Sequence, residues 1–264
     1  MQKKSVKAKA KKSLGQNFLV DKNVLKKIVD INLINDETEI VEIGPGTGNL
    51  TDYLINKNPK KIFIIEKDQE LSKNLLNKFF GKAEIINKDI LKFFDYKIFN
   101  KNTVIIGNLP YNISSQILVK FILDNNFKFK ALIFMFQKEM ANRILAKVNS
   151  KEYGRLSILS NWKFEIKKFF DIKPSSFYPK PKVESSLLLF KEKSKKFPLK
   201  DVKNLEKITR ILFNQRRKKI RKSINFIFKN NKNIISQLSL DQDLRPQNLD
   251  IKTYCNLASK YEDL

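Results

Sequence analysis

The segment Val41-Glu42-Ile43-Gly44-Pro45-Gly46-Thr47-Gly48 decides the fold of this 264-residue chain. It places a glycine-rich turn directly after a short apolar run, where a strand gives way to a helix. Glycine lets the backbone turn tightly and lets a ligand approach the main chain closely. The spacing is G-x-G-x-G, whereas dinucleotide-binding proteins use G-x-G-x-x-G, and Pro45 disfavours a pyrophosphate cradle. The segment therefore predicts a strand–turn–helix unit that binds a ligand other than a dinucleotide.

Strands and helices alternate on both sides of this turn. Short apolar runs have the length of buried strands, and apolar residues at helical spacing fill most of the gaps between them. Buried strands separated by helices indicate a mainly parallel sheet covered on both faces, so we expect an α/β fold of the Rossmann-like kind. The predicted strands are Glu39–Ile43, Lys61–Glu66, Ala83–Asn87, Thr103–Gly107, Lys130–Phe136, Trp162–Ile172 and Ser185–Lys191, with helices at Asp21–Leu33, Asp68–Phe80 and Ser114–Asn125.

The composition changes near Lys193, after which strand patterns vanish. Apolar residues at helical spacing continue to the end of the chain. We therefore predict two domains, an α/β domain of residues 1–192 and a small helical domain of residues 193–264. Its predicted helices are Val202–Asn214, Arg216–Phe228, Lys232–Leu238 and a last one that runs towards Tyr261.

Polar or flexible residues stand at the ends of four successive predicted strands: Gly44, Glu66, Asp89 and Asn108. Taken singly, such an acidic residue is more often a solvated strand end or a helix N-cap. Together they fall at the sheet edge where α/β proteins bind ligands. Glu66 is placed to accept both hydroxyls of a ribose, and Asp89 to accept from an adenine amine. Carboxylates around a glycine turn suit a cofactor without phosphates, such as S-adenosyl-L-methionine.

The tetrapeptide Asn108-Leu109-Pro110-Tyr111 directly follows the fourth of these strands. It combines an amide, a rigid backbone and an aromatic face, which together can present the exocyclic amine of a base to an electrophile. We expect the Asn108 side-chain oxygen and the Leu109 carbonyl to accept hydrogen bonds from that amine. Pro110 would fix the backbone and Tyr111 would stack on the base. This arrangement predicts methyl transfer to a nucleobase nitrogen.

The chain carries 53 Lys and Arg against 27 Asp and Glu, a net charge of +26. Such an excess attracts a polyanion from a distance and makes its binding salt-dependent. Compositional bias explains scattered lysines, but Gln215–Lys222 concentrates six cations within eight residues on a predicted helix. Arginine there adds bidentate phosphate recognition. We expect RNA to be bound by this cluster and by a basic N-terminal arm, through Lys11, Lys12, Arg216, Arg217, Lys218, Lys219 and Arg221.

Several classes of function are disfavoured by what the sequence lacks. There is no histidine, so histidine bases and histidine-ligated metals are excluded, and the single Cys255 excludes multi-cysteine zinc clusters and internal disulfides. We therefore expect no metal. Apolar runs are too short to span a membrane and the first residues lack a secretory pattern. A cytoplasmic protein, acting as a monomer, is the expectation.

Five motifs stand at Leu14–Leu19, Glu42–Gly48, Gly107–Tyr111, Phe177–Val183 and Phe213–Lys219. Together they resemble the ribosomal RNA adenine N6,N6-dimethyltransferases, over nearly the whole chain. The resemblance implies a seven-stranded class I methyltransferase sheet whose last strand is antiparallel, with S-adenosylmethionine bound by Asn17, Leu19, Gly44, Glu66, Asp89 and Asn108. It also favours Phe177 as the surface that stacks on the target base opposite Tyr111, over a role as a buried loop anchor.

The resemblance implies a substrate of two adjacent adenosines in the 3′-terminal hairpin of 16S rRNA, within the small ribosomal subunit during its assembly. A 23S rRNA adenine methyltransferase of the macrolide-resistance type shares the catalytic motifs. A non-catalytic RNA-binding assembly factor, or a relative of a mitochondrial transcription factor, is the alternative from another class. The Phe213–Lys219 motif and the helical domain favour the first, and the complete set of cofactor residues argues against lost catalysis.

Overall fold

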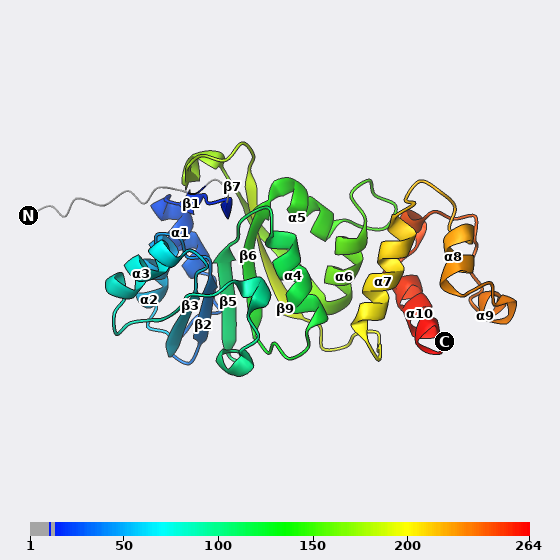
Figure 1. Cartoon of the computed structure of the whole chain (residues 1–264). Coiled ribbons are helices and arrows are strands. Elements are labelled where there is room, and N and C mark those ends of the chain that lie inside the picture. Colours follow the sequence, from blue (N-terminus) through cyan, green and yellow to red (C-terminus); the bar gives the residue numbers. More distant parts are fainter. Residues whose placement is uncertain (1–10, 12–13) are drawn as a thin grey trace, which may run out of the picture. The chain divides into compact units, whose positions relative to one another are not determined.

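A computed structural model describes residue 11 and residues 14–264 of the chain. Its main feature is a seven-stranded sheet with the order β4-β3-β2-β5-β6-β9-β7 (Figure 1). All seven predicted strands are present, so the expected α/β class is confirmed. The strands are β2 (Glu39–Ile43), β3 (Lys61–Ile65), β4 (Glu84–Ile86), β5 (Thr103–Asn108), β6 (Ala131–Gln137), β7 (Phe164–Ile172) and β9 (Ser185–Glu192).

Strand direction brings several functional segments to one edge of the sheet. Strands β2 to β6 pair in parallel, and β9 pairs antiparallel with β6. Asn108 therefore lies beside Met135, and Gln137 lies opposite Ser185. The antiparallel final strand that the resemblance implied is confirmed, and the carboxyl ends of β2, β3, β4 and β5 meet at the ligand-binding edge.

Aspartate side chains cap the N-termini of two α-helices in this domain. The Asp21 side chain accepts hydrogen bonds from the amides of Asn23 and Val24 and is the N-cap of α1. Asp68 caps α3 in the same way. The strands themselves are rich in Ile, Val and Phe, and many of these side chains are wholly buried in the core. The helices here are α1 (Lys22–Val29), α2 (Asn49–Ile55), α3 (Gln69–Lys78) and α4 (Ser114–Leu123), with short 3-10 helices η2 (Ile90–Lys92) and η3 (Tyr96–Ile98).

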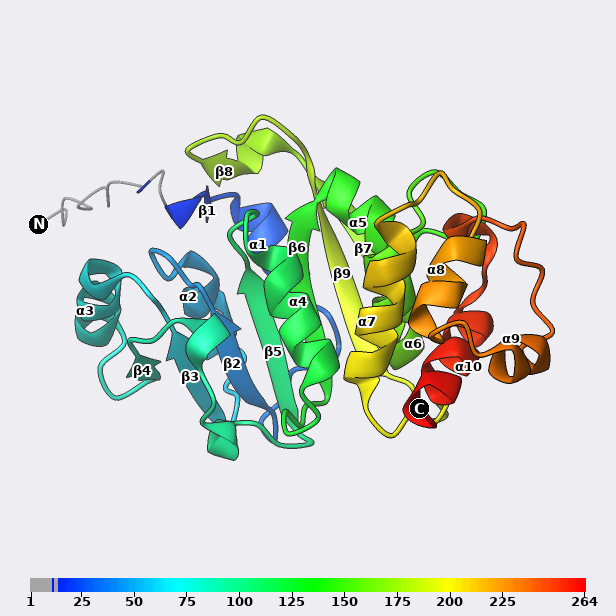
Figure 2. The ribbon, with the colours of Figure 1, turned by 45° about the vertical axis from the view of Figure 1, so that its right-hand side comes forward.

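A second, two-stranded sheet joins the segment that begins at Leu14 to a proline-rich loop, which contains Pro174, Pro179 and Pro181. Strands β1 (Phe18–Leu19) and β8 (Phe177–Tyr178) lie side by side in Figure 2 and pair antiparallel. Strand β8 directly follows the 3-10 helix η4 (Pro174–Ser176). The amide of Val20 donates to the Ser176 carbonyl at 2.9 Å. Sequence patterns did not predict this pairing, because two-residue strands have no measurable periodicity.

The chain divides into two compact units, and their limits differ from the expected boundary at residue 193. The second unit includes residues 121–123, 139–166 and 192–264. Helix α6 belongs to it because α6 packs against α7 and α10, with Arg155 and Glu206 forming an ion pair at 2.6 Å. Its elements include α5 (Lys138–Leu145), α6 (Arg155–Lys163), α7 (Val202–Phe213), α8 (Arg221–Ile227), α9 (Lys232–Gln237), η5 (Pro246–Asn248) and α10 (Ile251–Glu262).

Several predicted element boundaries need correction. The helix expected to run to Leu33 ends at Val29. The strand expected from Trp162 begins at Phe164, because Trp162 and Lys163 complete helix α6. The helix expected from Arg216 begins at Arg221. The preceding residues form a turn after α7, and crowding like charges onto one helix would be unfavourable. Within the described residues, no helix has the length and apolarity needed to cross a membrane.

Candidate active site

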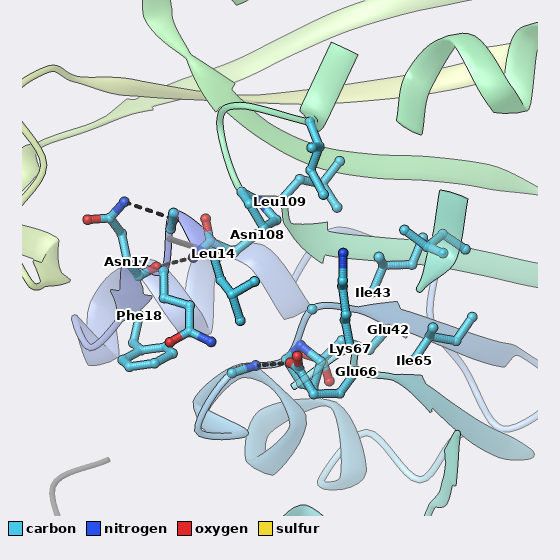
Figure 3. A pocket seen from close by; sticks show the side chains of 18 of the residues that line it. Leu14, Asn17, Phe18, Glu42, Ile43, Ile65, Glu66, Lys67, Asn108 and Leu109 are labelled. Carbon is cyan, nitrogen blue, oxygen red and sulfur yellow. Dashed lines mark hydrogen bonds between the residues drawn. The ribbon is translucent and has the colours of Figure 1, made fainter. Parts of the chain in front are cut away.

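A cavity lies at the carboxyl ends of β2, β3, β4 and β5, and residues 14–19 form another of its walls (Figure 3). It brings together the cofactor residues predicted from sequence with the tetrapeptide of the β5 end. Segments far apart in the chain thus converge on one site. The predicted residues that line it are Asn17, Leu19, Gly44, Glu66, Asp89, Asn108, Leu109, Pro110 and Tyr111.

The glycine turn requires glycine for two reasons. Gly44, Gly46 and Gly48 have φ values of +65°, +60° and +76°, a region that other residues seldom adopt. In addition, a Cβ atom at Gly46 would come within 2.5 Å of the Phe18 ring. The ring of Phe18 therefore packs directly on the turn, and any side chain at Gly46 would push it away.

Glu66 is held in a fixed orientation at the end of β3. Its carboxylate is 6% exposed and accepts hydrogen bonds from the backbone amides of Gly46 at 3.3 Å and Asp68 at 2.8 Å. Burial raises the pKa of this carboxyl, against the lowering effect of the two amides. Each oxygen keeps acceptor capacity for a further donor, which is what two neighbouring hydroxyls need.

Asp89 caps a short helix and also lines the cavity. Its side chain caps η2 through the Leu91 amide at 3.0 Å, and it pairs with Lys67 at 2.9 Å. Burial raises the pKa of Asp89, but the hydrogen bonds from Lys67 and Leu91 outweigh burial, so the pKa is lowered and the group is ionised near neutral pH. The helix-cap interpretation and the ligand-site interpretation therefore both describe this residue.

Glu42 also lines the cavity, although no role was predicted for it. Its side chain is almost fully buried and accepts a hydrogen bond from the Thr51 hydroxyl at 2.6 Å. Burial raises the pKa of Glu42 to about 8. The signal missed in the sequence was a carboxylic acid between Val41 and Ile43 inside a predicted buried strand, because burying a charge is costly without a function.

The tetrapeptide presents two free hydrogen-bond acceptors. The Asn108 amide nitrogen donates to the Asn17 carbonyl at 2.7 Å, which leaves the Asn108 side-chain oxygen available. The Leu109 carbonyl has no hydrogen-bond partner among the described residues. The Tyr111 hydroxyl lies 2.6 Å from the Ser185 hydroxyl, which fixes the aromatic ring. The contact of these groups with an amine stays a prediction.

Phe177 lies apart from the other predicted catalytic residues. It is 3% exposed, belongs to the hydrophobic core and pairs with Leu19 in the β1–β8 sheet. It does not line the cavity. In this structure Phe177 anchors the loop that carries it, and its stacking on a target base stays a prediction. The exposed aromatic side chain of this loop is its neighbour Tyr178, at 55%.

The basic cluster is a turn in which the cations have different environments. Arg216 donates to the side chain of Gln247 and to the carbonyls of Ser150 and Lys151, so it connects parts of the helical unit. Lys219 and Arg221 share Asp243. The exposed Arg217 and Lys218 have no side-chain partner among the described residues.

The predicted basic arm is described at one position only. Lys11 forms an ion pair with Asp68 at 2.8 Å, close to the cavity wall that Gln16 contributes. Hydrogen bonding to Asp68 raises the pKa of Lys11. Lys12 lies outside the described residues. The first described cation of the arm is thus bound to the protein's own carboxylate, and its contact with RNA stays a prediction.

Comparison with known proteins assigns the chain to a family. The family model for ribosomal RNA adenine dimethylase matches residues 7–263. A ribosomal RNA small subunit methyltransferase A from Pelagibacter ubique is 54% identical, covering 97% of this chain and 98% of the relative. A relative of the same name from Francisella tularensis is 41% identical, covering 96% of this chain and 98% of its own length.

Solved structures agree with this assignment. A dimethyladenosine transferase from Plasmodium falciparum superimposes with a TM-score of 0.74 at 28% identity, covering 91% of this chain and 95% of that one. The 23S rRNA methyltransferase ErmE gives a TM-score of 0.65 at 20% identity, over 93% of this chain and 100% of that chain, and so shares the fold. The sheet is thus that of a class I methyltransferase. The chain belongs to the ribosomal RNA adenine dimethylase family, and it is an enzyme that transfers methyl groups.

Proposed function

We propose that this protein transfers methyl groups from S-adenosyl-L-methionine to the N6 atoms of two adjacent adenosines in the 3′-terminal hairpin of 16S rRNA, during assembly of the small ribosomal subunit. The observation that carries the proposal is the pair of free acceptors, the Asn108 side-chain oxygen and the Leu109 carbonyl, at the wall of the cavity. An amine with two N–H groups is the ligand that satisfies both.

The cavity fits the methyl donor chemically. The described residues of its lining include the Glu66 and Asp89 carboxylates, and Lys67 there is paired with Asp89. Lys88 is the other cation of the described lining, so acidic acceptors for hydroxyl and amine donors lie beside the glycine turn, as a nucleoside without phosphates needs. When bound, S-adenosylmethionine supplies an electrophilic methyl group. Glu66 would hold the ribose hydroxyls and Asp89 the adenine amine, with Gly44 letting the main chain approach. Asn17 and Leu19 would cover the ligand. Their segment is held by the hydrogen bond that the Asn108 side chain donates to the Asn17 carbonyl.

The enzyme's own residues activate the adenine amine by positioning it. An aromatic amine is a weak nucleophile because its lone pair is delocalised into the ring. Hydrogen bonds from the amine to Asn108 and Leu109 favour a pyramidal nitrogen and aim its lone pair at the methyl group. Pro110 holds the backbone for this task and Tyr111 supports the base. The amine proton leaves to water after transfer, so no histidine base is needed.

RNA would be held by cations that the fold leaves accessible. Arg217 and Lys218 are exposed on the turn after α7, where their side chains can contact phosphates. The Arg216 side chain is already hydrogen-bonded within the helical unit. We therefore leave it out of the proposed RNA-binding surface. We also propose that the enzyme acts as a monomer in the cytoplasm, because the cavity is built from one chain and the proposed substrate is a ribosomal subunit.

The small-subunit substrate is preferred to a 23S rRNA target. Two relatives named for the small subunit match nearly full length at 54% and 41% identity. The solved 23S rRNA methyltransferase is 20% identical, so its likeness concerns the fold alone.

The test is a methylation assay with labelled S-adenosylmethionine and small subunits that lack the modification, followed by mapping of the labelled nucleotides. We expect two adjacent labelled adenosines near the 3′ end of 16S rRNA. Label in large-subunit RNA would move the assignment to the 23S substrate. Absence of label, together with no heat stabilisation by S-adenosylmethionine, would indicate an RNA-binding protein without catalysis.

A further inference from the structure

A second hollow adjoins the proposed cofactor cavity. It is lined by Gly15, Asn17, Tyr111, Asn112 and Gln137. The first four of these residues also line the cavity, so the two spaces share a wall. Gln137 lines only the hollow. It is therefore the residue that distinguishes this space from the cofactor site.

The sheet register places Gln137 beside the reacting groups. Asn108 pairs with Met135 on the neighbouring strand, and Gln137 follows two residues later, so all three side chains share one face of the sheet. Gln137 is directly opposite Ser185, whose hydroxyl lies 2.6 Å from that of Tyr111. A base that rests on Tyr111 while Asn108 holds its amine would thus lie next to the Gln137 side chain.

The Gln137 amide has no hydrogen-bond partner among the described residues, although the residue is partly buried. The amide remains accessible from the hollow, so its two N–H donors and its oxygen are available to a ligand that enters there. Amide side chains are also the groups that recognise adenine in nucleic acids.

We propose that Gln137 is a specificity-determining residue whose side-chain amide donates a hydrogen bond to a ring nitrogen of the target adenine. Both amine hydrogens of that base are taken by Asn108 and Leu109, so the acceptors that flank the amine are the ring nitrogens N1 and N7. Gln137 must therefore act as a donor. Guanine would be rejected, because it carries a carbonyl oxygen in place of the amine. This inference rests on the proposed function and adds the residue that reads the base.

The test compares Gln137→Glu and Gln137→Ala with the wild type on unmethylated small subunits. Glutamate keeps the size and shape of glutamine but its carboxylate cannot donate. We expect kcat/KM to fall about tenfold in both variants, the equivalent of one hydrogen bond. Heat stabilisation by S-adenosylmethionine should be unchanged, because Gln137 does not line the cofactor cavity. A Gln137→Glu enzyme with wild-type kcat/KM would overturn the proposal.

Substrate analogues identify the atom. Subunits reconstituted with 1-deazaadenosine or 7-deazaadenosine at the target lack one ring nitrogen each. The wild type should lose about tenfold with one of the two analogues, and the Gln137 variants should lose nothing further with it. A wild type indifferent to both analogues, or losses that multiply in the variants, would contradict the assignment. A wild type that fails to methylate ordinary subunits would instead refute the proposed function.

Discussion

Asn108 takes part in two interactions. Its side-chain nitrogen donates a hydrogen bond to the Asn17 carbonyl, and its side-chain oxygen is available at the wall of the cavity. We predict that Asn108→Ala lowers kcat roughly 100- to 1,000-fold, the usual effect of removing a positioned polar group from an active site. Binding to small subunits should persist, since the exposed cations are untouched. Single-turnover assays and a filter-binding assay measure the two quantities, and near-normal turnover would refute the role.

Glu42 makes stability depend on pH. Burial raises the pKa of its carboxyl to about 8 from the ordinary 4.5, so the folded protein favours the protonated form. Its contribution to stability is fully present below pH 4.5 and is lost as the pH rises through about 8. Glu42→Gln keeps an acceptor for Thr51 and does not titrate.

We therefore predict that, relative to Glu42→Gln, the wild type loses free energy of unfolding across this pH interval. Above it, the variant should be the more stable protein. Urea unfolding at pH values below, within and above the interval provides the measurement. Parallel curves for the two proteins at all pH values would show that Glu42 keeps an ordinary pKa.

At the scale of elements, the turn between α7 and α8 separates cations that look alike in sequence. Arg217→Ala combined with Lys218→Ala should weaken RNA binding and lower the slope of log affinity against log salt by roughly 0.9 per lost phosphate contact. Melting temperature should not change, because these side chains are exposed and have no described partner.

Arg216→Ala is the matched control for the double variant. Its side chain donates to the carbonyls of Ser150 and Lys151, so its loss should cost roughly 1–3 kcal/mol of unfolding free energy. If the double variant left the salt slope unchanged, the turn would not be the RNA surface.

Sequence periodicity predicted the elements that are long or strongly patterned. The strands from Glu39, Lys61 and Thr103 appear where expected, because runs of Ile, Val and Phe leave little alternative. Helix α8 begins later than predicted, since periodicity does not report the contacts that Arg216 makes elsewhere. The burial of Phe177 was likewise decided by a tertiary contact, its pairing with Leu19.

At the scale of the whole molecule, the sequence predicted the sheet and the cavity better than the division into units. The strand-end residues Gly44, Glu66, Asp89 and Asn108 converge because parallel strands end at one edge, a rule that needs no coordinates. The position of α6 follows from packing between distant segments, which local patterns do not report. The two compact units therefore have limits that differ from the predicted domain boundary.

The paired acceptors at the end of β5 have a consequence for how the reaction stops. An unmodified adenine amine offers two N–H groups, one for the Asn108 oxygen and one for the Leu109 carbonyl. The first transfer removes one of these donors and the second removes the other. The affinity of the base for the site should therefore fall with each methyl group added. The finished nucleotide keeps no N–H to hold, so completion of the modification itself favours product release.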